Sequence, residues 1–361
     1  MENPMNNMRF HRLDQMSLKH LRALDRAKTV VLIPIGMLEE HGEHLPMGTD
    51  TFGAEALTLA AVAWLLEADP AVHMLVMPGL PYGTDPVDRQ RPDLFSTSGS
   101  VWISRETLKM TVSDIASHMV RYGFRYIFPI GFHGGADQSI VLEEVCSELR
   151  GKNPGLVMYE PVGYVLAGAE RDITPGLATL LGRPLTTQEE VSLKGSIHAS
   201  MFETSMILSL KPELVDRQYK RLRTIEWREM FDMPDWPGYV GSGPSHADAS
   251  IGGAVLRWRG VRCGALIRRA MAGEDLSQLV RHPKWLSDDH GNADIPETAV
   301  QTEPLTHEPS VDSKPVMILP HRPGEAEAEV AEDENSTPPS TLLQTKPRLP
   351  RLDDKDANRS S

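Results

Sequence analysis

The chain has 361 residues and a formal net charge of −13, with 50 acidic residues against 37 Lys and Arg. This acidic balance argues against a nucleic-acid-binding protein, which would normally show a basic face. Hydrophobic residues at 40% and charged residues at 24% are ordinary globular values, for one large domain or two small ones.

We expect no signal peptide and no membrane span, because the N-terminus has no apolar core and no run reads as long enough to cross a bilayer. The two cysteines, Cys146 and Cys263, lie in helix-like contexts and are predicted to be buried, reduced thiols. These features together predict a cytoplasmic protein.

Strand-like and helix-like runs alternate along the chain. The runs that predict strands are Thr29–Ile35, Val72–Met77, Arg125–Ile130 and Leu156–Tyr159. The runs that predict helices are Phe52–Ala68, Glu106–Tyr122, Asp137–Arg150, Ala199–Leu208 and about Ala249–Met271. The end of the fourth helix could equally be a strand. This alternation predicts a single-domain α/β fold, with a mostly parallel β-sheet flanked by helices on both faces.

The composition changes from Gly291 to Ser361, which hold 14 acidic residues, seven Lys or Arg and ten prolines. No apolar periodicity survives there, so the segment cannot bury enough surface to offset its ordering entropy. We predict a disordered acidic, Pro-rich tail over residues 291–361, either a docking arm for a partner or a solubilising extension.

The stretch from Pro34 to Asp50, PIGMLEEHGEHLPMGTD, concentrates carboxylates and imidazoles directly after the first predicted strand. Glu39 and His41 are two residues apart, so their side chains leave an extended chain on the same side. Asp50 follows after a short loop, just ahead of a helix-like run. The three side chains can converge on one metal ion. The alternative is that Glu39 and His41 are ordinary loop residues and Asp50 caps the helix.

His133 follows the predicted strand Arg125–Ile130, and ligands in open α/β sheets bind outside the carboxyl ends of the strands. Gly134 and Gly135 let the backbone pass close to a metal or substrate. Alternatively, they form a tight turn that holds a packed histidine. Carboxylates and imidazoles without thiolates suit Zn²⁺, Mn²⁺ or Fe²⁺.

Three motifs together resemble the signatures of the creatininase (creatinine amidohydrolase) family. The pattern P-x-G-S-x-E-Q-H-G-P-H-L-P-x-x-T-D is matched by Pro34–Asp50, N-G-H-G-G-N by Gly131–Ala136, and H-A-G-x-x-E-T-S by His198–Ser205. The motifs occur in the family's order, and the likeness runs from about Leu13 to about Leu279. We therefore assign a creatininase-like amidohydrolase domain to residues 13–282.

The resemblance implies a divalent-metal cofactor, with two ions of Zn, Mn or Fe. It gives Glu39, Asp50 and His133 to one ion, and His41 with a bridging Asp50 to the other. Creatininase carries a further glutamate ligand two residues after the histidine of the second motif, where this chain has Gly135. In members that share this glycine, the glutamate of the third motif is expected to take over, which here is Glu203.

The resemblance also implies an activity, the hydrolysis of a C–N bond in a linear or cyclic small-molecule amide by a metal-bound hydroxide. His198 is expected to donate a proton to the leaving nitrogen, with a helix-start role as the alternative, and Glu203 is a second candidate acid or base. Creatinine is a poor candidate substrate, because Lys194 stands where creatinine-hydrolysing members have a tryptophan. A deformylase, an enzyme that trims a modified peptide, and a non-catalytic binding protein that retains the metal site remain alternatives.

Two features near the motifs leave open interpretations. His44 is expected to support the ligands or simply to lie in their loop. The segment Pro81–Pro92 lies where the family places a substrate-facing loop, and its polar side chains either read a polar substrate or face solvent. These are Tyr82, Asp85, Arg89 and Arg91. Family members are commonly ring-like oligomers, so the resemblance also implies a homo-oligomer.

Overall fold

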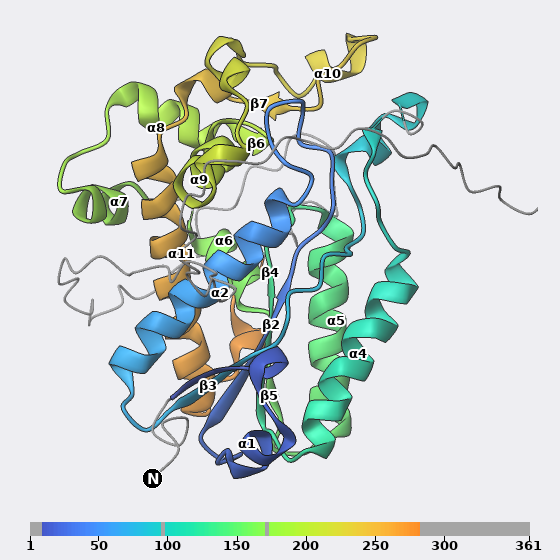
Figure 1. Ribbon diagram of the computed structural model, residues 1–361, viewed down its shortest axis with the longest axis vertical. Coiled ribbons are helices and arrows are strands. Elements are labelled where there is room, and N and C mark those ends of the chain that lie inside the picture. The colour runs from blue at the N-terminus through green and yellow to red at the C-terminus, as the bar shows by residue number, and fades with distance from the viewer. Residues whose placement is uncertain (1–8, 95–97, 170–172, 282–361) are drawn as a thin grey trace, which may run out of the picture. The chain divides into compact units, whose positions relative to one another are not determined.

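The computed structural model describes residues 9–94, 98–169 and 173–281, and its central feature is one five-stranded sheet (Figure 1). The strand order is β1-β3-β2-β4-β5, and every neighbouring pair is parallel. The strands are β1 (Phe10–Arg12), β2 (Thr29–Ile35), β3 (His73–Val76), β4 (Tyr126–Gly131) and β5 (Val157–Met158). The predicted mostly parallel sheet is confirmed, whereas the predicted tail lies outside the described residues.

Helices cover both faces of the sheet. On one face, α2 (Thr49–Ala68) and α9 (Met201–Leu210) both pack against α11 (Ala249–Met271). On the other face, α4 (Arg105–Arg121) packs against α5 (Ala136–Lys152). The shorter helices are α1 (Leu18–Ala23), α6 (Pro161–Ala169), α7 (Ile173–Leu181), α8 (Thr187–Lys194) and α10 (Glu229–Asp232).

Strand β2 shows why the sheet is buried on both faces. All of its residues are buried. Val30 and Leu32 belong to the hydrophobic cluster that includes α2 and α11, whereas Val31, Ile33 and Ile35 belong to the cluster that includes α4 and α5. Successive residues of a strand face opposite sides, so a central parallel strand requires a continuous apolar run.

Helix α2 corrects the expectation that no segment is long enough to span a membrane, because its 20 residues have the required length and hydropathy. In the structure, Leu57, Ala61 and Leu65 are buried in the cluster shared with α11. The two helices approach so closely at Gly260 that a Cβ there would lie 2.3 Å from the Cβ of Ala60. The apolar composition of α2 therefore matches its place as a core helix.

A second, small sheet is separate from the first and lies toward the carboxyl ends of its strands (Figure 1). Strands β6 (Ser196–His198) and β7 (Val240–Gly241) pair antiparallel, and Ile225 forms a bridge with Gly241. This sheet was not predicted from the sequence. It places His198 directly before α9, which begins at Met201. Helix α9 continues to Leu210, so the end of this segment is helical and the alternative of a strand there is wrong.

Candidate metal centre

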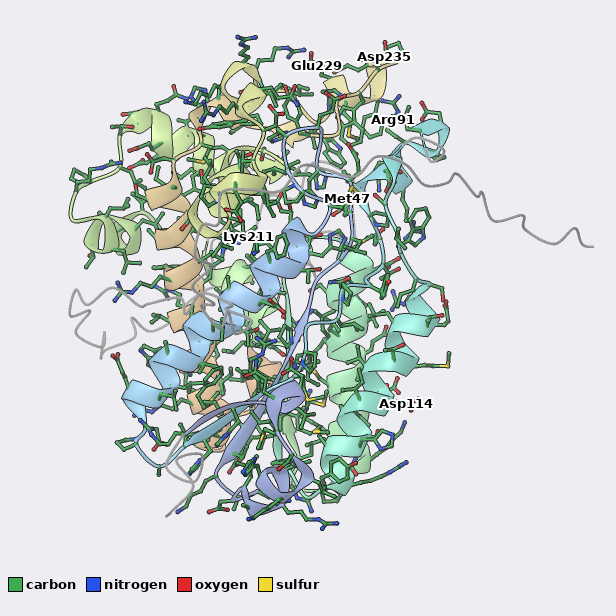
Figure 2. The ribbon with its side chains drawn as sticks, viewed as in Figure 1. Met47, Arg91, Asp114, Lys211, Glu229 and Asp235 are labelled. Carbon is green, nitrogen blue, oxygen red and sulfur yellow. The ribbon has the colours of Figure 1, made fainter. Side chains whose placement is uncertain are left out.

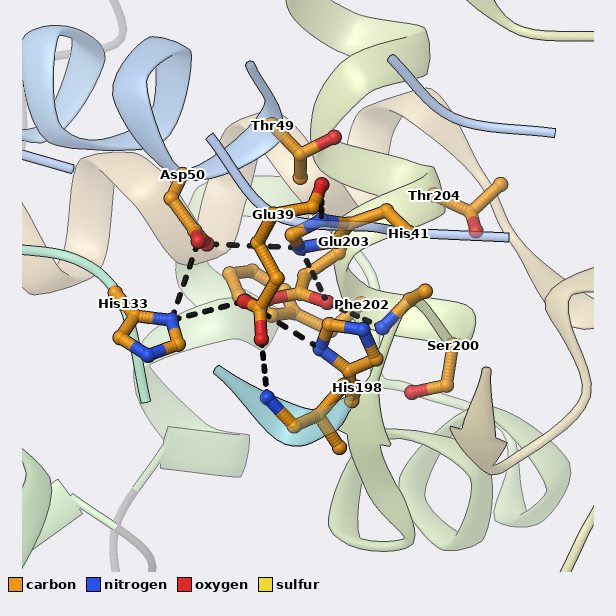
Figure 3. Close-up of polar contacts among 12 residues, drawn as sticks. Glu39, His41, Thr49, Asp50, His133, His198, Ser200, Phe202, Glu203 and Thr204 are labelled. Carbon is orange, nitrogen blue, oxygen red and sulfur yellow. Dashed lines mark hydrogen bonds and ion pairs between the residues drawn. The ribbon is translucent and has the colours of Figure 1, made fainter. Parts of the chain in front are cut away.

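The motif residues come from four segments and lie close together (Figure 3), beyond the carboxyl ends of β2 and β4. Glu39 and His41 lie in the loop after β2, and His133 follows β4. Asp50 lies in the first turn of α2, which begins at Thr49, so it is part of the helix rather than ahead of it. Glu203 lies in the first turn of α9. All are buried except Glu203, whose side chain is 13% exposed.

Two groups of possible ligand atoms share Asp50. In the first, His133 Nδ1 lies 2.9 Å from Glu39 Oε2 and 3.2 Å from Asp50 Oδ2. In the second, His41 Nε2 lies 3.6 Å from Asp50 Oδ1 and 3.7 Å from Glu203 Oε2. Each carboxylate oxygen of Asp50 therefore faces a different histidine.

The remaining ring nitrogen of each histidine is held by a backbone carbonyl. His41 Nδ1 is 3.0 Å from the oxygen of Glu39, and His133 Nε2 is 2.9 Å from that of Asp85. His198 Nε2 is 2.7 Å from the oxygen of Glu40. A carbonyl only accepts hydrogen bonds, so these nitrogens carry the protons. When the rings are neutral, as metal binding requires, the lone pairs of His41 Nε2, His133 Nδ1 and His198 Nδ1 face the centre. Burial opposes the charged form, but the neighbouring carboxylates raise the pKa of His41 to about 10 and that of His133 well above its usual value, so a bound cation would replace a proton on each of these two rings.

The atoms that face the centre fit a cation. Glu39 Oε2 and Asp50 Oδ2 are buried and converge on His133 Nδ1 at 2.9 and 3.2 Å, and the buried His41 Nε2 has no described hydrogen-bond partner. Lone pairs on neighbouring carboxylates and imidazoles repel one another unless a proton or cation lies between them. Ligand atoms about 2.0–2.2 Å from a tetrahedral zinc ion lie about 3.3–3.6 Å apart, close to the separations observed. The donor set thus suits Zn²⁺, Mn²⁺ or Fe²⁺.

Burial and crowded charge shift the protonation of this cluster. Burial alone would raise the pKa of Asp50, yet His41 and His133 hold it well below its usual range. Burial raises the pKa of Glu203 to about 7, and the carboxylates of Asp50 and Glu39 act in the same direction. Burial lowers the pKa of His198 to about 4, so this ring is neutral at pH 7. These opposed shifts are typical of functional sites.

His198 and Glu203 are positioned by an unusual local backbone. Ala199, between β6 and α9, has a φ of 47°, in the left-handed region that non-glycine residues rarely adopt. Its N–H donates a hydrogen bond of 2.5 Å to Glu203 Oε2. The His198 ring lies 4.4 Å from the His41 ring, between centroids, and its Nδ1 is 3.9 Å from Glu39 Oε2. Both residues predicted from the third motif therefore reach the centre.

Position 135 has no room for a side chain. A Cβ on Gly135 would lie 2.4 Å from His133 Nε2 and 2.5 Å from the carbonyl oxygen of Asp85. A carboxylate from this position is thus excluded while His133 and Asp85 stay in place. In the group that contains His41 and Asp50, the third ligand atom comes from Glu203.

Other residues predicted near the site have supporting roles. His44 is buried, and its Nε2 lies 3.1 Å from Thr204 Oγ1, so it links the first motif to α9. Arg91 donates hydrogen bonds of 2.6 and 2.9 Å to the carbonyls of Met230 and Met233, near the segment that carries Glu229 and Asp235 (Figure 2). Arg91 therefore fixes the backbone of α10 and of the residue that follows it.

In the same loop, Tyr82 is exposed, whereas Arg89 forms ion pairs with Asp85 and Asp137. Two contacts to the centre come from the loop's backbone and were missed, the Asp85 carbonyl on His133 and the Val87 N–H on Glu39. Every residue has these backbone groups, so no side-chain pattern in the sequence signals them.

Comparisons with known proteins place the motifs in a family. The creatininase family model, described as creatinine amidohydrolase, matches residues 14–266. A creatinine amidohydrolase of Pseudomonas putida is 30% identical over 190 residues, which are 52% of this chain and 66% of the relative. A mycofactocin precursor peptide peptidase of Mycobacterium ulcerans is 26% identical over 189 residues, 51% of this chain and 60% of the relative. The chain thus spans slightly less than two thirds of these relatives.

Solved structures share the fold. A Bacteroides fragilis protein described as a creatinine amidohydrolase superposes with a TM-score of 0.53 at 19% identity, over 74% of this chain and 99% of its own. A manganese form of creatininase superposes with a TM-score of 0.50 at 22% identity, over 72% of this chain and 98% of its own. At these identities the likeness establishes the fold alone.

Proposed function

The chain belongs to the creatininase family, and we propose that it hydrolyses the C–N bond of an amide at a divalent-metal centre built around Asp50. The observation that carries this proposal is the orientation of Asp50. Its two oxygens face His133 and His41 separately, and each histidine belongs to its own group of ligand atoms. A carboxylate placed in this way can bridge two ions.

The charges of the centre support two ions. Glu39, Asp50 and Glu203 contribute three negative charges when ionised, and the histidines are neutral when they offer lone pairs. One divalent ion would leave a net negative charge in a buried site, whereas two would give a site that attracts a hydroxide. Bound divalent ions lower the pKa of water enough to supply hydroxide near neutral pH and polarise a carbonyl.

His198 is placed to move a proton. Its Nε2–H is committed to the Glu40 carbonyl, and its Nδ1 lone pair faces the centre. The neutral ring therefore has no proton to donate toward the substrate at the start. It first accepts one at Nδ1 from the attacking water and then delivers it from Nδ1 to the leaving nitrogen. This refines the expectation of simple proton donation.

The substrate class follows from the bond that the relatives share. The Pseudomonas relative is named for creatinine and the mycobacterial one for a precursor peptide, and both names describe cleavage of an amide bond. In this chain Lys194 is exposed at the end of α8 and offers no aromatic wall for a small planar ring. We therefore propose a linear or cyclic amide other than creatinine.

The test is hydrolysis of a panel of substrates by metal-replete protein, with the ring-opened or cleaved products identified by mass spectrometry. The panel contains creatinine, other cyclic amides, formamides and peptides. Cleavage confined to formamides would assign a deformylase, and cleavage confined to peptides a peptide-trimming enzyme. Metal binding without turnover of any compound would identify a non-catalytic binding protein and contradict the proposed hydrolysis.

The Asp50→Asn variant tests whether any hydrolysis depends on the metal centre. An amide nitrogen cannot ligate an ion as a carboxylate oxygen does, so we expect a folded protein with lowered metal content and no turnover. Asp114→Asn makes the same change on the exposed surface of α4 and should keep both. A chelator should abolish the parent's activity, and Mn²⁺ or Zn²⁺ should restore it. Full metal content in Asp50→Asn would contradict the bridging role.

A further inference from the structure

Asp85 has a strained backbone beside the proposed metal centre. Its φ is 66°, and among the described residues other than glycine only Ala199 shares the left-handed conformation. Asp and Asn tolerate this region better than most residues, yet it remains uncommon even for them. Strain of this kind persists where surrounding contacts fix it, and it is frequent near functional sites.

The strained conformation aims the carbonyl of Asp85 at His133. The oxygen lies 2.9 Å from His133 Nε2 and can only accept, so Nε2 carries the proton and Nδ1 offers its lone pair to the centre. On that side, Nδ1 meets Glu39 Oε2 at 2.9 Å and Asp50 Oδ2 at 3.2 Å. If residue 85 adopted an ordinary backbone conformation, its carbonyl would turn away and the ring would lose this constraint.

The side chain of Asp85 anchors that conformation. Its Oδ2 accepts a hydrogen bond of 3.1 Å from the backbone N–H of Asp137, in the first turn of α5. Its Oδ1 pairs with Arg89 at 2.9 Å. Gly135 completes the arrangement, because any Cβ there would collide with the Asp85 oxygen and the His133 ring. Two side-chain contacts, together with the space left by Gly135, thus fix one peptide group against His133.

We propose that Asp85 is a positioning residue, which orients His133 through its own carbonyl and thereby sets the affinity of the Glu39–Asp50–His133 group for a divalent ion. This rests on the proposed function only in that the group binds such an ion. Comparable hydrogen bonds to metal-binding histidines change metal affinity by about tenfold to a hundredfold when removed.

The test compares variants of Asp85 by zinc affinity, measured in competition with a chromophoric chelator. Asp85→Asn retains the oxygen that accepts from Asp137 and tolerates the left-handed region, so we expect affinity close to that of the parent. Asp85→Val removes both anchors and disfavours that region, so we expect zinc affinity to fall about tenfold to a hundredfold. Asp85→Ala removes the anchors with a smaller steric penalty and gives the same test if Asp85→Val does not fold.

A second measurement reports on the hydrogen bond itself. In the zinc-loaded parent, the Nε2–H of His133 should give a slowly exchanging NMR signal, because the Asp85 carbonyl protects it. Asp85→Asn should retain this signal, and Asp85→Val or Asp85→Ala should lose it to solvent exchange. A residue that merely stabilised the fold would not change this one proton selectively.

Asp114→Ala is the matched control. Asp114 is exposed on α4 and makes none of the hydrogen bonds or ion pairs that fix Asp85 or His133, so its loss should leave zinc affinity and the His133 signal unchanged. Parent-like zinc affinity and a protected Nε2–H in Asp85→Val or Asp85→Ala would overturn the positioning role alone. A parent that binds no zinc would contradict the proposed function and, with it, this inference.

Discussion

At the scale of single residues, Gly135 determines which residue supplies the third ligand atom of the group that contains His41 and Asp50. Creatininase resembles this chain in its motifs but carries a glutamate at the corresponding position. Here the Asp85 carbonyl and the His133 ring occupy the space that the side chain would need. Glu203 supplies the third atom from α9 instead. A glutamate at position 135 is therefore excluded in this structure while the Asp85 carbonyl and the His133 ring stay in place.

Restoring the glutamate should consequently damage the site. We predict that Gly135→Glu lowers metal content and thermal stability, because its Cβ would lie 2.4 Å from His133 Nε2. Gly134→Ala is the control, since no atom lies within 4 Å of a Cβ at that position. Metal analysis and thermal denaturation of both variants measure the effect. A Gly135→Glu protein with unchanged stability and undiminished metal content would show that the loop can rearrange.

The site could be anticipated to the extent that its chemistry resides in side chains. Glu39, His41 and Asp50 were recognisable because carboxylates and imidazoles cluster after an apolar strand, and His133 because it follows a second strand. The structure brings them together, and their role as ligands remains a prediction. The Asp85 carbonyl could not be anticipated, because its orientation depends on a strained φ that only the tertiary contacts of Arg89 and Asp137 determine.

At the scale of elements, the contact of α2 with α11 holds Asp50 in place, since Asp50 lies in the first turn of α2. We predict that Gly260→Ala destabilises the protein by about 1–3 kcal/mol, because the added methyl group would overlap Ala60. Gly151→Ala, near the exposed end of α5, meets no atom within 4 Å and should stabilise by about 0.5–1 kcal/mol. Urea denaturation compares them, and equal stability of both variants would contradict the close helix contact.

The elements that the sequence predicted well are those whose pattern is local. Strand Thr29–Ile35 and helix Ala249–Met271 were predicted with their observed bounds, because a continuous apolar run and a long amphipathic run are unambiguous. Strands β6 and β7 were missed, because each is short and gains its stability from a partner distant in sequence. Helix α8 was missed for a related reason, since few of its residues are buried.

At the scale of the whole molecule, Arg281 is the last residue that the structure describes, and its side chain is bonded to the interior of the domain. Its guanidinium pairs with the buried Glu160 at 2.6 Å and donates to the Ser139 carbonyl at 2.9 Å. Glu160 in turn accepts from the N–H groups of Val162 and Gly163 at the start of α6. The last described residue is thus tied to the carboxyl end of β5.

We predict that deleting residues 291–361 leaves thermal stability and metal content nearly unchanged, because the Pro-rich, acidic composition of this segment cannot form a core. Arg281→Met is the contrasting variant. It leaves Glu160 buried without its partner, at a cost of about 3 kcal/mol or more. A large fall in melting temperature on deleting 291–361 would show that the segment packs against the domain.

The central claim is that Asp50 joins two metal positions and that Glu203 completes the second. Metal analysis of the purified parent and of Glu203→Gln tests it most directly. We predict about two divalent ions per chain in the parent and about one in the variant, with the position at His133 retained. One ion in the parent, or two in Glu203→Gln, would contradict it.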